Sequence, residues 1–352
     1  MKKRLMLIML LMLVTLTSCI SGLLPDTVEK EPDVVQIEND IVTVYDTISK
    51  GCVGIYGTSD IATSLGSGVI YKEDNGTYYV VTNHHVIDKM KDLKIYRGGS
   101  KYYRATVLGS DEHNDLAVLT FTLDLFGGEE VYIHDIFSYD EESVKVGQTA
   151  LAIGCPLGLE NFNTLTTGVV SKVTKKQIQT NAEINPGNSG GGLFNLSGRL
   201  IGINTEKKAY TAATNSDGSV TQVPVEGIAY AISLSIVKES ILDIEEAGDD
   251  IERPKLGITV TAVNRYVSNE EYVKYLPNSH DMGILVVDAG EGVAAEAGIK
   301  LNDVILSMDD TEINELDDLS YFMSLVKKKE TIKISVFRSS TGQVSEIEVT
   351  LK

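Results

Sequence analysis

The sequence predicts a mostly β domain followed by a smaller α+β domain, and three observations lead to this prediction. The chain has 352 residues, which fits two domains of roughly 100 to 200 residues each. From about residue 41 to residue 233, short β-branched runs alternate with turn residues, as they do in β-barrels or a β-sandwich. A helical pattern and the acidic stretch "EEAGDDIERP" then separate this region from a second, compact pattern of strands and helices.

The N-terminus has the layout of a secretory signal. Lys2, Lys3 and Arg4 precede an apolar run over residues 5–14, which is too short for a comfortable membrane span of about 20 residues. The ending "LTSC" resembles the bacterial lipobox, so we expect a lipoprotein signal peptide over residues 1–18 and lipidation of Cys19. A plain signal peptide cut near Ser18 and an uncleaved anchor are the alternatives. Residues 19–40, with two prolines and six acidic side chains, are expected to be an acidic tether.

The first domain contains strong hairpin and strand signals. Asp74-Asn75-Gly76 lies between two apolar-rich runs, and Gly98-Gly99 interrupts a second such pair. The polar residues 206–227 are expected to form a long surface loop. Further strands are expected over residues 116–122, 149–153, 168–174, 192–194 and 200–205.

A helix over residues 232–247 is expected to end the first domain, because apolar side chains recur there at helical spacing. In the second domain the segments "ITVTAV", "GILVVDAG", "DVILSMDD", "TIKISVFR" and "SEIEVTL" read as strands, and "EGVAAEAGI" as a short helix. A longer helix is expected within residues 315–329, with Asn314 as its N-cap.

Composition and charge exclude some classes of partner. Hydrophobic residues make up 43% and charged residues 23% of the chain, as in ordinary globular proteins. The net charge of −19 repels phosphate backbones, so we expect no nucleic-acid partner. Besides Cys19, the chain has two cysteines, Cys52 and Cys155, in apolar strand-like contexts. One pair is not a disulfide framework, and we expect two buried free thiols.

The stretch "NPGNSGGGL" places Ser189 among glycines that allow a tight turn and close approach to a substrate. A serine hydroxyl attacks a carbonyl only if an imidazole takes its proton and backbone N–H groups meet the oxyanion. The predicted oxyanion hole is the segment Gly187, Asn188 and Ser189, in which the N–H groups of Gly187 and Ser189 converge.

The chain offers a base and a carboxylate for that serine. Among five histidines, His84 and His85 follow an apolar strand, whose end is a rigid place from which to project a base. Asp115 stands at the mouth of another apolar strand and is the preferred orienting carboxylate, with Asp111 as the alternative. A histidine pair also fits part of a metal site, but matched ligands are missing. We therefore expect no metal and no cofactor.

The order histidine, aspartate, serine is that of chymotrypsin-type proteases. Four motifs spread over about 120 residues, in the correct order, resemble the HtrA (Deg) family of serine proteases. The resemblance implies that His85 is the base, Asp115 its orienting acid and Ser189 the nucleophile. The motifs are Gly66-Ser67-Gly68-Val69-Ile70, Thr82-Asn83-His84-His85-Val86, Asp115-Leu116-Ala117-Val118-Leu119 and Asn185-Pro186-Gly187-Asn188-Ser189-Gly190-Gly191.

The resemblance also implies the architecture and the biology. It implies a chymotrypsin-like protease domain of two six-stranded β-barrels over residues 41–250 and one PDZ domain over residues 251–352. In "KLGI", the N–H groups of Leu256, Gly257 and Ile258 are then expected to bind a peptide C-terminus. It further implies a homotrimer that degrades misfolded or damaged exported proteins and cleaves after small or medium aliphatic residues. The lipobox-like N-terminus leads us to expect that lipid anchors it outside the cytoplasm.

Some features depart from the family or leave the function open. Asn181, Asn302 and Cys155 replace an aspartate, a glycine and an asparagine that are usual in the family. Asn302 should tolerate a left-handed backbone. Glu183 lies six residues before the serine, but the sequence does not establish it as the base of a specificity pocket. Two other functions stay open: an inactive protease fold that binds peptides as a scaffold or chaperone, and an esterase with the same triad.

Overall fold

The computed structural model describes residues 34–123, 130–138, 144–207, 210–214, 220–224, 226–263 and 283–352. The expected signal peptide, Cys19 and the tether up to residue 33 lie outside these residues. The chain divides into a segment over residues 1–43 and a compact body over residues 44–352. Across the described ranges, every helix is too short or too polar to cross a bilayer.

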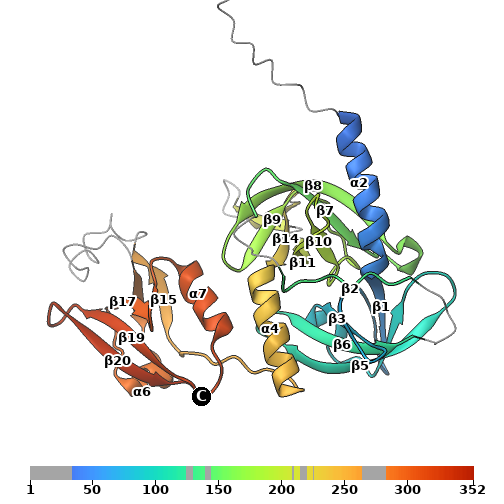
Figure 1. Ribbon diagram of the computed structural model, residues 1–352. Coiled ribbons are helices and arrows are strands. Elements are labelled where there is room, and N and C mark those ends of the chain that lie inside the picture. The colour runs from blue at the N-terminus through green and yellow to red at the C-terminus, as the bar shows by residue number, and fades with distance from the viewer. Residues whose placement is uncertain are drawn as a thin grey trace, which may run out of the picture. The chain divides into compact units, whose positions relative to one another are not determined.

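The first barrel of the body is closed, in the strand order β1-β2-β3-β6-β5-β4 (Figure 1). Neighbouring strands are antiparallel, and the interior is filled by apolar side chains such as Val53, Ile70 and Leu119. The strands are β1 (Cys52–Thr58), β2 (Thr63–Asp74), β3 (Thr77–Thr82), β4 (Asp92–Tyr96), β5 (Tyr102–Asp111) and β6 (Leu116–Thr122).

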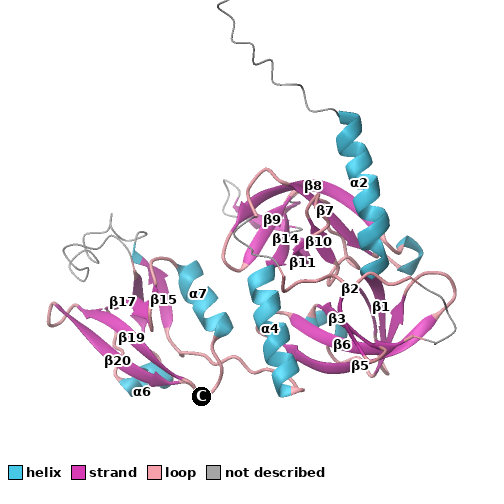
Figure 2. Ribbon diagram, viewed as in Figure 1, coloured by secondary structure: helices cyan, strands magenta, loops and turns pink. Residues whose placement is uncertain are grey.

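A second closed barrel follows, in the order β10-β11-β14-β9-β8-β7. Its core includes Ala150, Leu193 and Ile201. Its strands are β7 (Thr149–Gly154), β8 (Thr164–Val173), β9 (Gln177–Thr180), β10 (Gly192–Phe194), β11 (Leu200–Lys207) and β14 (Ala229–Ser233). Figure 2 shows how strongly strands dominate this part of the chain. The two closed six-stranded barrels confirm the chymotrypsin-like fold class.

The residues in the turns explain where the chain reverses direction between strands. In the β2–β3 hairpin, Asn75 and Gly76 adopt φ values of 51° and 83°, as a two-residue turn of this hand requires. The hairpin and strand predictions of the first domain are confirmed, with β6 and β10 at the predicted bounds. The loop expected over residues 206–227 is partly wrong, because a separate hairpin of β12 (Tyr210–Thr214) and β13 (Val220–Pro224) lies within it. Its threonine and valine content favours strands.

Helices lie at both ends of the barrel region. The expected β pattern from residue 41 is wrong at its start, because α2 (Val34–Ile48) and the 3₁₀ turn η1 (Ser49–Gly51) precede β1. The apolar residues Val34, Ile37, Ile41, Val44 and Ile48 recur at spacings of three and four, which is a helical period. The other elements are the short helix α3 (His84–Ile87), the 3₁₀ turn η3 (Leu159–Asn161) and α4 (Leu234–Ala247).

The C-terminal part of the body is a sheet in the order β15-β16-β17-β19-β20, with β18 paired to β17. The N-cap of its long helix is Glu315, not Asn314, because Glu315 and Asp318 form a reciprocal capping box. Asn302 has a φ of 67°, which confirms its left-handed conformation. The elements are β15 (Thr259–Ala262), β16 (Ile284–Asp288), α6 (Val293–Ala297), β17 (Asp303–Met308), β18 (Thr311–Glu312), α7 (Leu316–Leu325), β19 (Thr331–Arg338) and β20 (Gln343–Thr350).

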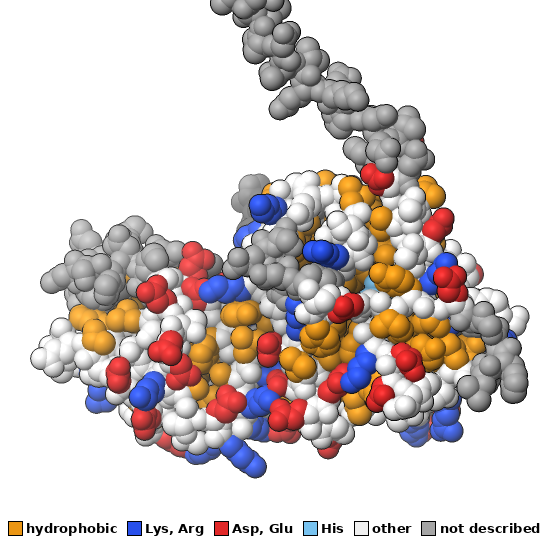
Figure 3. Space-filling view, viewed as in Figure 1, with side chains coloured by type: hydrophobic (Ala, Val, Ile, Leu, Met, Phe, Trp, Pro, Cys, Tyr) orange, Lys and Arg blue, Asp and Glu red, His pale blue; other side chains and the backbone are white. Residues whose placement is uncertain are grey.

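The charged surface and the two cysteines agree with what the composition led us to expect. Figure 3 shows acidic and basic side chains interspersed over the visible face, with no continuous basic surface there. Cys52 and Cys155 are both free and buried, as expected. Burial raises the pKa of both thiols, so neither is poised as a nucleophile.

Candidate active site

Strand register brings His85 and Asp115 together. β3 pairs with β6 so that Thr82 faces Ala117, and this places the residues after β3 beside the residues before β6. The His85 Nδ1 atom lies 2.9 Å from Oδ1 and 2.8 Å from Oδ2 of Asp115. The backbone N–H of His85 also donates to Asp115 Oδ1 at 3.0 Å. The carboxylate therefore holds both the imidazole and the backbone of the residue that carries it.

Asp115 adopts an uncommon backbone conformation. Its φ is 53°, in the left-handed region that non-glycine residues rarely enter, and its carbonyl accepts a hydrogen bond from Asn83 Nδ2 at 2.9 Å. Burial raises the pKa of its carboxyl, but the hydrogen bonds from His85 and Thr205 outweigh this effect and hold the pKa below its usual range. Asp115 is therefore a charged acceptor at neutral pH.

Ser189 lies in the loop before β10, and Thr205 joins it to the acid. The Ser189 hydroxyl donates to the carbonyl oxygen of Thr205 at 3.1 Å. The Thr205 hydroxyl donates to Asp115 Oδ2 at 2.9 Å. A single residue of β11 thus contacts two of the three predicted catalytic residues.

The backbone of the serine loop leaves two N–H groups for a ligand. None of the described residues accepts a hydrogen bond from the N–H of Gly187 or of Ser189. Gly187 has a φ of 100°, and a Cβ there would lie 2.2 Å from the carbonyl oxygen of Cys155. The Pro186 carbonyl accepts a hydrogen bond from the backbone N–H of Leu157 at 2.8 Å, and this bond fixes its position. An oxyanion hole needs backbone N–H groups that are not already bound to other acceptors.

Asn188 does not belong to the predicted oxyanion hole. Its N–H donates to the carbonyl of Asn185 at 2.9 Å, which closes the turn and leaves that donor unavailable. The tight turn itself therefore uses the Asn188 donor. Only Gly187 and Ser189 retain donors for an oxyanion.

Ser67 and Thr205 are functional candidates that sequence reasoning missed. Ser67 Oγ donates to the Gly187 carbonyl at 2.7 Å and accepts from Cys155 N at 2.9 Å. Its backbone N–H donates to the Ser189 carbonyl at 2.8 Å. The "GSGVI" motif gave a signal for Ser67, whereas nothing in "GINTEK" distinguished Thr205. Both residues shape the serine loop from other strands.

The alternative candidates lie elsewhere or make other contacts. Asp111 binds Arg253 and Asn114 rather than a histidine. His134 is buried and directs Nε2 to the Ile48 carbonyl at 3.1 Å. Glu183 is exposed, accepts from Asn185 Nδ2 at 2.9 Å, and lines an open cavity of about 330 Å³. Among the described residues, no three His, Cys, Asp or Glu side chains converge as metal ligands do.

The loop before β15 contains the second predicted site. No described residue accepts from the N–H groups of Leu256, Gly257 or Ile258. Gly257 has a φ of 74°, and a Cβ there would lie 2.7 Å from the Cα of Gly292. β15 pairs with β16 and stands at the end of the sheet order, so its other edge has no partner strand among those described.

Comparisons with known proteins agree with both parts. Residues 66–203 match the trypsin-like peptidase domain, and residues 254–351 match the PDZ domain. The serine protease Do-like HtrA of Lactococcus lactis subsp. cremoris (strain MG1363) is 35% identical over 303 residues, covering 82% of this chain and 71% of that protein. The protein of the same name from Bacillus subtilis (strain 168) is 30% identical over 313 residues, covering 84% and 65%.

Solved structures give the same result. The HtrA-type protease AlgW with tripeptide is 29% identical, covers 88% of this chain and 97% of that chain, and has a TM-score of 0.67. A serine endoprotease from Yersinia pestis is 28% identical, with coverages of 88% and 97% and a TM-score of 0.62. Both likenesses extend over the barrels and the C-terminal sheet.

Proposed function

Because this chain belongs to the HtrA family of serine endopeptidases and carries one PDZ domain, we propose that His85, Asp115 and Ser189 form its catalytic triad. The observation that carries the proposal is the double contact of His85 Nδ1 with the Asp115 carboxylate, at 2.9 and 2.8 Å. Such a contact fixes the imidazole tautomer, so that Nε2 is left to accept a proton.

In the proposed reaction, Ser189 turns its hydroxyl from the Thr205 carbonyl to His85 Nε2 and attacks a peptide carbonyl carbon. His85 takes the hydroxyl proton and then gives it to the leaving amine, while Asp115 stabilises the imidazolium. The N–H groups of Gly187 and Ser189 donate to the oxyanion. Water then attacks the acyl carbonyl while His85 takes its proton, and His85 returns that proton to the Ser189 oxygen as the acyl–oxygen bond breaks.

The PDZ domain is proposed to bind peptide C-termini. The N–H groups of Leu256, Gly257 and Ile258 would bind the terminal carboxylate, and the peptide would add a strand to the free edge of β15. The absence of described acceptors for these N–H groups supports this role. The N-terminal motif and the family resemblance support the rest of the proposal: a lipid anchor at Cys19, an extracytoplasmic location, a homotrimer, and misfolded exported proteins as substrates.

A digestion assay with purified full-length chain tests the activity. We expect the wild-type chain to degrade unfolded casein faster than the Ser189→Ala variant does. That variant controls for contaminating proteases. Peptides with free apolar C-termini should bind the chain, and their C-terminally amidated counterparts should bind more weakly. Turnover of small esters without casein turnover would favour the esterase, and peptide binding without any turnover would favour the scaffold.

A further inference from the structure

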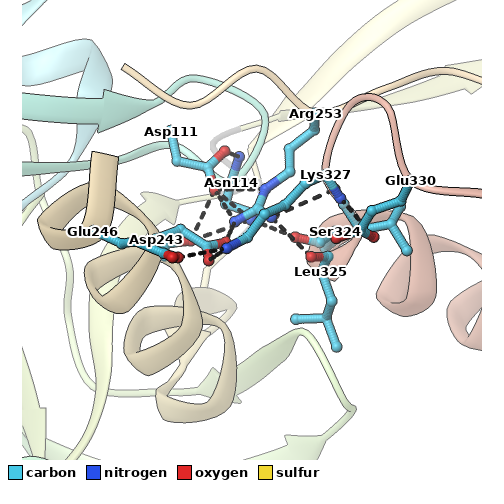
Figure 4. A network of polar contacts seen from close by, with 11 residues as sticks. Asp111, Asn114, Asp243, Glu246, Arg253, Ser324, Leu325, Lys327 and Glu330 are labelled. Atoms are coloured by element: carbon cyan, nitrogen blue, oxygen red, sulfur yellow. Dashed lines mark hydrogen bonds and ion pairs between the residues drawn. The ribbon is translucent and has the colours of Figure 1, made fainter. Parts of the chain in front are cut away.

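A buried polar cluster lies beside the turn that precedes Asp115, and the proposed reaction does not use it (Figure 4). The side chains of Asp111 and Arg253 are 0% exposed. We name it the Arg253 cluster, and its members are Asp111, Asn114, Ser240, Asp243 and Arg253.

The charges of the cluster are arranged around one guanidinium group. Arg253 donates from Nε and Nη2 to Asp111 Oδ2 at 3.0 and 2.8 Å, and its Nη2 lies 2.8 Å from Asp243 Oδ2. Lys327, at the rim, lies 2.6 Å from Asp243 Oδ1. Each buried charge therefore has an opposite partner. Such ion clusters are weak evidence for stability, but they hold one arrangement, because losing one partner leaves a buried charge uncompensated.

Asp111 also fixes the shape of the turn to Asp115. Its Oδ1 accepts from the Asn114 backbone N–H at 3.1 Å, and its Oδ2 accepts from Asn114 Nδ2 at 2.9 Å. Asp115 N then donates to the Glu112 carbonyl at 3.2 Å. The left-handed backbone of Asp115 persists only where its surroundings hold it. Asp111 is the buried charge that ties this turn to the rest of the molecule.

The C-terminal end of α7 completes the cluster. The Ser324 carbonyl accepts from Asn114 Nδ2 at 2.9 Å, and the Leu325 carbonyl accepts from Arg253 Nη1 at 2.9 Å. The last carbonyls of a helix have no partner within the helix, so they need external donors, and the positive guanidinium suits the negative end of the helix dipole. The PDZ domain thus contacts the turn of the predicted triad acid directly.

We propose that Asp111 and Arg253 are positioning residues for Asp115, and that the last turn of α7 completes their support. The proposal rests on the proposed role of Asp115 as the triad acid. A shift of the turn moves the carboxylate relative to His85 Nδ1, and a misplacement of about 1 Å costs roughly 100-fold in rate. The PDZ domain then contributes to catalysis even before it binds a peptide.

The test measures kcat and KM for a short peptide substrate, using the full chain and counting active sites by fluorophosphonate incorporation. Asp111→Asn keeps the shape of the side chain and removes its charge. We expect kcat per labelled site to fall at least tenfold, with KM changed less than threefold. Arg253→Lys keeps the positive charge but loses the paired N–H donors. We expect its kcat per labelled site to fall less than that of Asp111→Asn. Asn114→Ala keeps the ion pair, loses the amide link to Ser324, and serves if Asp111→Asn does not fold.

Lys328→Gln is the matched control. Lys328 pairs at the surface with Glu252, so it also links the segment before Arg253 to the segment after α7, yet it does not contact the Asp111 turn. We expect its kcat to stay within twofold of the wild-type value. Asp111→Asn and Asn114→Ala could instead lower the melting temperature or the number of labelled sites while kcat per site stays within twofold. The cluster would then only stabilise the fold, and the proposal would be wrong. If Asp115→Asn keeps wild-type kcat, the proposed triad fails instead.

Discussion

Two loops of this molecule leave backbone N–H groups without acceptors among the described residues, and one of them contains the proposed nucleophile, Ser189. Gly187 has a φ of 100° in the serine loop, and Gly257 has a φ of 74° in the loop before β15. The serine loop is tied by hydrogen bonds from Ser67 and Leu157. The second loop is packed against the Gly292 backbone. Backbone N–H groups suffice to bind an anion, whereas chemistry also needs the hydroxyl and the imidazole.

The largest expected effect comes from a change at Asp115, which should impair catalysis at the serine loop and leave peptide binding at the loop before β15 unchanged. Asp115→Asn should lower kcat by about 10⁴-fold, because an amide does not hold the imidazole in the tautomer that accepts the serine proton. Hydrolysis of a fluorogenic peptide measures this loss. Fluorescence anisotropy of a labelled C-terminal peptide should give the wild-type affinity. A residual rate within tenfold of the wild-type rate would contradict the assigned acid.

The next effect concerns the serine loop alone. Gly187→Ala should lower kcat by about 10²- to 10³-fold, because its Cβ would lie 2.2 Å from the Cys155 carbonyl oxygen and displace an oxyanion donor. Gly147→Ala is the matched control, since Gly147 has a φ of 91° and no atom within 4 Å of an added Cβ. Equal losses in both variants would show that backbone strain, not the oxyanion hole, determines the rate.

The third effect concerns the loop before β15. Gly257→Ala should weaken binding of a C-terminal peptide at least about tenfold, or 1.4 kcal/mol, because the added Cβ meets Gly292 and turns the N–H groups away. Titration calorimetry measures the change. The control is Gly298→Ala, at a φ of 104° with open space around its Cβ. Unchanged affinity in the Gly257 variant would exclude this loop as the carboxylate site.

The last prediction concerns acid stability, because unfolding at low pH also lowers the measured activity. Burial lowers the pKa of His134 from 6.5 to about 4. The unfolded chain therefore takes up this proton first as the pH falls, and the stability present above pH 6.5 is lost down to about pH 4. Between pH 7 and pH 5 the loss from this group is about 2 kcal/mol. Urea unfolding of His134→Gln at both pH values should show a smaller difference; an equal difference would assign the loss to other groups.

Much of the site was predictable because it follows local patterns. His85, Asp115 and Ser189 stand at strand ends with recognisable neighbours, and the strand register brings the first two together. Thr205 was not predictable, because its contact with Asp115 depends on how β11 faces the other barrel. Asp111 was weighed as a triad acid, and only the fold shows that it pairs with Arg253, 142 residues away.

In the fold, too, the features set by neighbouring residues were easier to predict than those that depend on a wider pattern. Turn residues such as Asn75 and Gly76 fixed the hairpins locally. The helix over residues 34–48 was missed because its valines and isoleucines also suit strands, and their helical spacing was the stronger signal. The N-cap shifted from Asn314 to Glu315 because the capping box depends on the Asp318 side chain.

The most direct test of the central claim is to map the residue that a fluorophosphonate modifies. The full chain is labelled at neutral pH, digested and analysed by mass spectrometry. An adduct on Ser189 that disappears in His85→Ala is the result that the proposed triad predicts. An adduct on Ser67 or on any other residue, or labelling of Ser189 that does not depend on His85, would contradict it.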